Sequence, residues 1–78
     1  MARFFFDIAH GGQSFADDEG SDLESIESVR GIALETLLET AGRRAPTEDH
    51  TELRIAVRDE RGASVFRGLL TISGKWTA

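Results

Sequence analysis

Hydrophobic and polar residues alternate near both ends of the chain and repeat with helical spacing in the middle. Residues 3–8 place Phe4, Phe6 and Ile8 on one side, which predicts a strand because successive side chains of a strand point to opposite faces. Two glycines then supply a turn, and residues 13–17 are expected to return as a short second strand. The first part of the chain is therefore predicted to be a β-hairpin.

The middle of the chain has the pattern of one long amphipathic helix. Ser21 and Glu24 have the spacing of a capping box, which places the helix start at about Asp22, and Gly42 is a natural residue for its end. The apolar side chains fall on one arc at about 100° per residue. They are Leu23, Ile26, Ala33, Leu34, Leu37, Leu38 and Ala41. Arg30 projects into the middle of this arc.

A guanidinium group on an apolar arc needs acidic partners or access to water. Glu27 lies three residues earlier on the same side of the helix, and Asp7 and Asp17 belong to the first hairpin. We expect Arg30 to form structural ion pairs with these carboxylates and so to tie the helix to the hairpin. An anion-binding role is less favoured because no other basic residues cluster beside Arg30.

A second hairpin is predicted after a polar connection at residues 44–51. Residues 52–58 and 63–72 form its strands, and residues 59–62 form its turn, with Gly62 in the left-handed conformation. The expected fold is α+β in the order ββαββ, an antiparallel four-stranded sheet with one α-helix packed on one face.

The register of the second hairpin decides which side chains face away from the helix. Pairing Asp59 with Ala63 places Val57 opposite Val65, and both faces of the sheet then carry apolar residues. An uncovered apolar face favours self-association. The candidate interface residues are Phe5, Phe66, Leu70 and Ile72, joined by Trp76 near the end of the chain. The alternative is a β-bulge near Gly68, which would return Leu70 and Ile72 to the helix side.

Size and charge limit the possible functions. The 78 residues are expected to form one domain, 1–78, and 40% of them are hydrophobic. No run approaches the length of a membrane span, Asp7 interrupts the apolar start short of a signal-peptide core, and the chain has no cysteine. A net charge of −5 disfavours nucleic acid as a partner. The sequence therefore predicts a cytoplasmic protein with no membrane partner.

The polar residues do not match a recognised catalytic or metal-binding pattern. Asp17, Asp18, Glu19 and Asp22 form an acidic cluster, but their spacing is not that of an EF-hand, and acids near a helix start stabilise its dipole. Whether residues 17–22 bind a cation stays open. We expect no enzymatic activity, no cofactor and no metal.

The basic residues of the second hairpin are a candidate nucleic-acid surface. In the predicted register Arg54 and Arg58 lie on the face opposite to Arg67, so the three do not form one patch. This arrangement also argues against nucleic-acid binding.

Several segments resemble an uncharacterised family of short alphaproteobacterial proteins, common in rhizobia, domain of unknown function 6894. They are residues 3–8, 18–23, 29–30, 33–34 and 55–62. The family's helical arginine corresponds to Arg30, whereas Glu24 and Ile32 depart from its usual proline and polar residue. The first forty or so residues are also similar, more faintly, to HicB-like antitoxin domains. The resemblance implies a bacterial origin and a fold, and it brings no known activity.

The interpretation that fits these observations is a homo-oligomeric protein-interaction module, with further copies of itself or an unidentified protein as partners. Two alternatives stay open. One is an antitoxin-like or regulatory module acting with a toxin or nucleic acid, and the other is a small-ligand or metal-binding domain.

Overall fold

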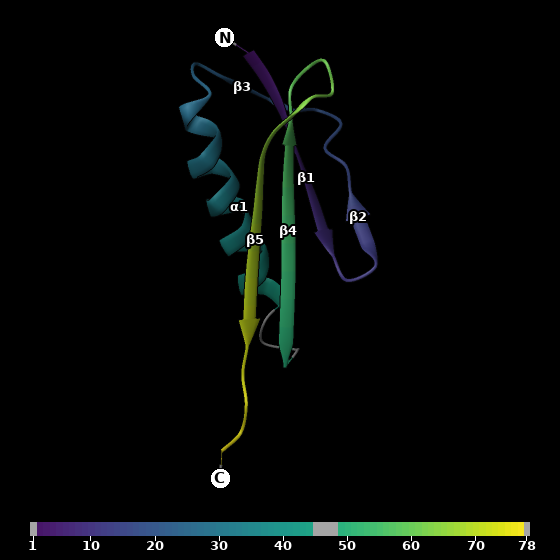
Figure 1. Cartoon of the computed structure of the whole chain (residues 1–78), viewed down its shortest axis with the longest axis vertical. Helices are drawn as coiled ribbons and strands as arrows, with labels where there is room; N and C mark the ends of the chain where they lie inside the picture. Colours follow the sequence, from purple (N-terminus) through teal and green to yellow (C-terminus); the bar gives the residue numbers. More distant parts are fainter. Residues whose placement is uncertain (1, 45–48, 78) are drawn as a thin grey trace.

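One helix lies against one face of an antiparallel five-stranded sheet in the computed structural model, which describes residues 2–44 and 49–77 (Figure 1). The elements are β1 (Ala2–His10), β2 (Gln13–Phe15), β3 (Ser21–Leu23), α1 (Glu27–Arg44), β4 (His50–Arg58) and β5 (Ser64–Ser73). The strand order is β2-β1-β4-β5, and β3 also pairs with β1. The α+β class and the general order are as predicted, but the sheet has five strands instead of four. The predicted polar connection lies partly outside the described residues, at 45–48.

The additional strand occupies the place where the sequence predicted the helix to begin. Ser21 lies in β3 opposite Phe4 of β1, and α1 begins at Glu27 instead of Asp22. Pairing with β1 satisfies backbone groups of both strands, and this outweighs the local capping signal of Ser21 and Glu24. The capping-box prediction is therefore wrong.

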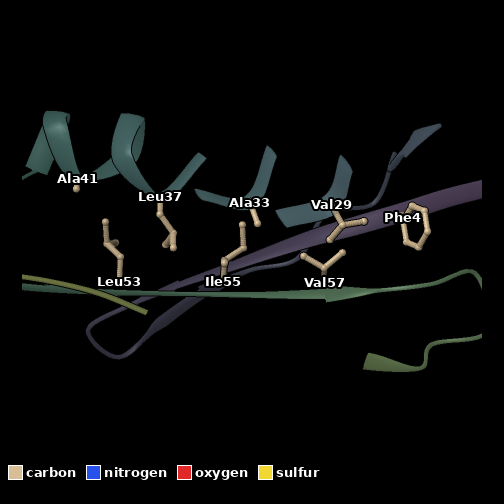
Figure 2. Packing of buried hydrophobic residues seen from close by; sticks show 8 residues of the cluster. All are labelled: Phe4, Val29, Ala33, Leu37, Ala41, Leu53, Ile55 and Val57. Carbon is tan, nitrogen blue, oxygen red and sulfur yellow. The ribbon is translucent and has the colours of Figure 1, made fainter. Parts of the chain in front are cut away.

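The core is the layer between α1 and the sheet. Four helix residues, Val29, Ala33, Leu37 and Ala41, point toward Leu53, Ile55 and Val57 of β4 and toward Phe4 of β1 (Figure 2). All eight are at most 5% exposed. The predicted inner face of β1 is confirmed, because Phe6 and Ile8 pack against this cluster.

The buried helix residues follow one another at intervals of four, which turns the buried direction by about 40° at each step. The helix therefore crosses β5 and β4 obliquely (Figure 1). At its first turn Val29 points to the sheet, and Arg30 lies about 100° further round. Arg30 is exposed, so the prediction that it lies in the middle of the buried arc is wrong.

The turn of the second hairpin is as predicted. The Asp59 N–H donates to the carbonyl of Ala63 over 2.9 Å, and Gly62 has a φ of +86°. The Asp59 carboxylate also accepts from the N–H groups of Arg61 and Ala63, which closes the loop. These contacts fix where β5 begins.

A β-bulge directly after this turn changes the register that the sequence predicted. Arg58 pairs with Ser64 but Val57 pairs with Phe66, so Val65 is an extra residue on β5. Every later side chain of β5 is thereby moved to the other face. The residues predicted on the face away from the helix, Phe66, Leu70 and Ile72, instead lie on its side. The bulge alternative was right in kind, although its place is not Gly68.

Gly68 has a different role, in the contact between α1 and β5. A Cβ atom at this position would lie 3.0 Å from Cγ2 of Ile55 and 3.2 Å from Cδ1 of Leu37. The missing side chain therefore makes room for Leu37 between the helix and the sheet.

The oblique crossing predicts opposite effects for two neighbouring leucines. Leu37 is 1% exposed and Leu38 is 62% exposed. Leu37→Ala should lower the free energy of unfolding by about 2–5 kcal/mol because it opens a cavity. Leu38→Ala should change it by less than about 0.5 kcal/mol. Urea denaturation of both variants measures the difference, and equal effects would show that the helix is rotated from this position.

Candidate functional site

The outer edge of β1 is paired at both ends but interrupted in the middle. β3 pairs with residues 2–4 and β2 with residues 8–10. Asp17, from the loop between these two strands, fills the interval. Its Oδ2 accepts from the N–H of Phe6 at 3.1 Å, and its own N–H donates to Oδ1 of Asp7 at 2.8 Å. One residue thus replaces the missing strand partner.

The same carboxylate holds its own loop. Oδ1 of Asp17 accepts from the N–H groups of Glu19 and Gly20 at 3.1 and 3.0 Å. The hydrogen bond from Gly20 contributes most to lowering the pKa of Asp17 below its ordinary value of 3.8, with smaller contributions from the Phe6 and Glu19 N–H groups and the charge of Arg58. Desolvation opposes this shift only in part. Asp17 is therefore held in its charged form by the fold.

Arg58 connects this arrangement to β4. Its Nε donates to Oδ2 of Asp7 at 2.9 Å, and its Nη2 donates to the carbonyl of Asp17 at 2.8 Å. Its guanidinium carbon lies 4.5 Å from the centre of the Phe5 ring, in the geometry of a cation–π contact. We call Asp7, Asp17 and Arg58 the carboxylate–arginine network.

The loop returns to the sheet at a glycine whose conformation excludes other residues. Gly20 has a φ of +75°, and a Cβ atom there would lie 2.8 Å from Cε2 of Phe5 and 2.9 Å from Cγ of Arg3. Arg3 then closes the loop from outside, because its side chain donates to the carboxylate of Asp22 and to the carbonyl of Glu19. The loop is fixed between β1 and two arginines.

The predicted ion pairs of Arg30 are not found among the described residues. The Asp7 carboxylate instead pairs with Arg58 of β4, and Asp17 accepts a hydrogen bond from Arg58 through its backbone carbonyl. Arg30 is exposed, and neither it nor Glu27 forms an ion pair with another residue in the described part of the chain. The spacing of Asp17 and Gly20 is the local signal that sequence analysis missed, since an Asp that accepts from N–H groups two and three residues later forms a turn.

The face of the sheet opposite α1, here called the open face, gathers the arginines that the sequence had separated. The bulge places Arg67 opposite Ala56, on the same face as Arg54 and Arg58. The prediction that these arginines lie on opposite faces is wrong. Arg58 is engaged with Asp7, and Arg54 contacts Glu52 at 2.7 Å.

A depression of about 450 Å³ lies in the open face, beside these arginines. Ala9, Ala56 and Leu69 line it together with Arg54 and Arg67, and apolar surface predominates. Within the described residues, Arg67 has no acidic side chain in ion-pair contact. The site therefore combines an apolar floor with an available guanidinium group.

The predicted interface residues are dispersed over the molecule. Phe66 and Leu70 pack against the core, and Phe5 lies under Arg58 on the open face. Ile72 is 39% exposed beside the helix, and Trp76, beyond the end of β5, is 94% exposed. They do not form one surface, and the interface role stays a prediction only for the residues that reach solvent.

The acidic residues 17–22 do not direct their carboxylates toward one position where a cation could bind. Asp17 accepts from backbone N–H groups, and Asp22 pairs with Arg3. No three His, Cys, Asp or Glu side chains within residues 2–44 and 49–77 are placed to hold a metal ion. Among the same described residues, no helix is both long enough and apolar enough to cross a membrane.

The fold and the site together define a small α+β domain whose sheet is covered by a helix on one face and carries arginines on the other. Residues 3–71 match a domain of unknown function, DUF6894, and the chain belongs to this family. No curated protein and no solved structure matches the chain.

The lowered pKa of Asp17 predicts a pH-dependent stability. Asp17→Asn should reduce the free energy of unfolding at pH 7 by about 1–3 kcal/mol, because charged acceptors form stronger hydrogen bonds. Since the folded pKa lies below the unfolded value, this contribution is present above pH 4 and is lost as the pH falls through the folded pKa. The difference in the free energy of unfolding between the wild type and Asp17→Asn should therefore become smaller in acid. Urea denaturation from pH 7 to pH 2.5 measures it.

Asp18→Asn is the matched control, because Asp18 is exposed and its substitution removes the same charge from the same loop. If it destabilises the protein as much as Asp17→Asn, net charge and not the hydrogen bonds of Asp17 would explain the effect.

Two glycines should respond oppositely to alanine. Gly20→Ala should destabilise the protein by about 1–3 kcal/mol, because the left-handed backbone and the close contacts with Phe5 and Arg3 both oppose a Cβ atom. Gly31 lies in α1 with open space around it, so Gly31→Ala should stabilise the protein by about 0.5–1 kcal/mol. Thermal melts of the two variants test this, and a stable Gly20→Ala would contradict the tight closure of the loop.

Proposed function

We propose that this chain is a noncatalytic interaction domain that forms a homodimer by pairing its β5 strand with β5 of a second copy. The observation that supports this proposal most directly is the edge of β5. In the order β2-β1-β4-β5, this ten-residue strand has a neighbour on one side only among the described residues. Unpaired backbone groups along such an edge are a template for another strand.

The β5 edge lacks the usual protection against strand pairing. The bulge disturbs only its start, and from Phe66 to Ser73 each residue pairs one-to-one with β4. The strand contains no proline, and Arg67 is its one charged residue. By contrast, the opposite edge of the sheet is divided between two three-residue strands. The β5 edge is thus the longer and more regular of the two.

Apolar side chains lie on both sides of this edge. Leu69 is 54% exposed on the open face, and Ile72 is 39% exposed on the helix side. Leu37 of α1 reaches Gly68 of β5, and Leu38, about 100° further round the helix, is 62% exposed. A second copy related by a two-fold axis would cover these residues in both chains.

The dimensions of the molecule also favour association. Its radius of gyration, with the projecting end after β5 included, is 14.0 Å (Figure 1), whereas a compact domain of this length has about 11.5 Å. A slender two-layer structure buries less of its surface than a rounder one, and pairing adds to the buried surface.

The network supports a noncatalytic role. The fold lowers the pKa of Asp17, whose two carboxylate oxygens accept hydrogen bonds from three backbone N–H groups. A carboxylate held in this way fixes a loop and is not available to exchange protons. We further propose a bacterial, cytoplasmic setting, in keeping with the absence of cysteine.

The antitoxin-like alternative with a toxin or nucleic-acid partner is the second proposal. The shared face of Arg54, Arg58 and Arg67 favours it, but two of these arginines already pair with carboxylates of the same chain. Self-association therefore has the stronger support.

Dimerisation predicts a specific effect of charge at the β5 edge. At 50 µM the wild-type chain should have twice the monomer mass by light scattering. Ile72→Lys should be monomeric, because an isolated charge at a strand edge opposes pairing. Ile26→Lys is the control, since Ile26 is also exposed, at 56% against 39% for Ile72, and lies before α1, away from the β5 edge. A monomeric wild type, or equal dissociation by both variants, would overturn the proposal.

A further inference from the structure

We propose that the depression in the open face binds a small anion with an apolar body, such as an aromatic carboxylate, and that Arg67 is its principal anion ligand. All of its lining residues come from one chain, so the site is complete without the dimer proposed above.

The floor of the depression is built from small side chains on neighbouring strands. Ala9 of β1 and Ala56 of β4 point to the open face. Ile8, Ile55 and Gly68 are on the α1 side of their strands, so they line the depression with backbone atoms. The volume of about 450 Å³ lies within the usual range of small-molecule sites, about 300–1,000 Å³. An apolar group of a ligand therefore has a surface on which to lie.

The walls supply the positive charge. Arg67 lies directly opposite Ala56 on the next strand, and Arg54 lies directly opposite Leu69. The two arginines are therefore diagonal neighbours on adjacent strands, and such positions are about 7–8 Å apart along the sheet. Glu52 neutralises Arg54 at 2.7 Å, whereas Arg67 has no acid in contact among the described residues. A guanidinium fork matches a carboxylate in two parallel hydrogen bonds.

The neighbouring acids limit the kind of anion that fits. Asp7 lines the depression on the side of β1, and Glu52 lies at the other end of the arginine pair on β4. An extended phosphate backbone crossing the sheet would meet both carboxylates, whereas a single small anion at Arg67 avoids them. The observations therefore favour a small molecule over a nucleic acid.

The test uses 2-naphthoate as the probe, with 2-naphthalenemethanol and inorganic phosphate as controls for its charge and its apolar body. Amide shifts in two-dimensional NMR spectra should centre on residues 8–9, 55–56 and 67–69 when naphthoate is added. Neither control should bind with comparable affinity, because each lacks one of the two features that the depression recognises.

Arg67→Gln should weaken naphthoate binding at least fivefold. Arg30→Gln removes the same charge from an exposed position on the helix and should leave the affinity unchanged. Melting curves of both variants establish that they are folded, and the light-scattering mass reports the dimer separately.

Four results would overturn the proposal: no binding of naphthoate up to 10 mM, shifts centred elsewhere, equal binding of either control compound, or equal weakening by the two arginine variants. If a ten-residue oligothymidylate shifts the same amides and displaces naphthoate, the open face is a nucleic-acid surface instead.

Discussion

The hydrogen bonds of the Asp17 carboxylate join the middle of β1 to the loop between β2 and β3, where neither of these two strands pairs with β1. One of them pairs with the backbone of β1 at Phe6, between the parts of β1 that pair with β2 and β3. The others fix the loop that leads from β2 to β3. Arg58 then binds this loop to β4 through the Asp17 carbonyl and through Asp7. The first hairpin, the third strand and the central strand pair all meet at one half-buried charge.

The bulge next to the second turn determines the character of both faces of the sheet. One extra residue, Val65, sends Phe66 and Leu70 into the core and leaves Arg67 and Leu69 outside. Without it, the core would lack a phenylalanine and a leucine, and the open face would carry them in place of its arginine. A local change in strand pairing thus separates an apolar interior from a charged surface.

The parts of the fold that depend on local pattern could be predicted, and those that depend on long-range pairing could not. The inner face of β1 follows from simple alternation, and the turn closed by Asp59 and Gly62 from familiar turn residues. The third strand exists because Ser21 meets Phe4 across the sheet, and no neighbouring residue signals that contact. Arg30 was misplaced because an average helical arc ignores the angle at which a helix crosses its sheet. The depression depends on the bulge, which places Arg67 and Leu69 on the open face, so it could not be predicted from local pattern either.

The strand that forms the free edge of the sheet is also a wall of the depression. Arg67 and Leu69 of β5 line the hollow, and the backbone of the same residues carries the unpaired hydrogen-bonding groups. A partner strand at this edge would raise a second wall beside Arg67 and change the electrostatic field there. Thermodynamic linkage then requires that whatever factor assembly applies to ligand affinity, the ligand applies to assembly. Under the two proposals above, binding of a small anion would change the oligomeric state of this domain without any hinge or lid.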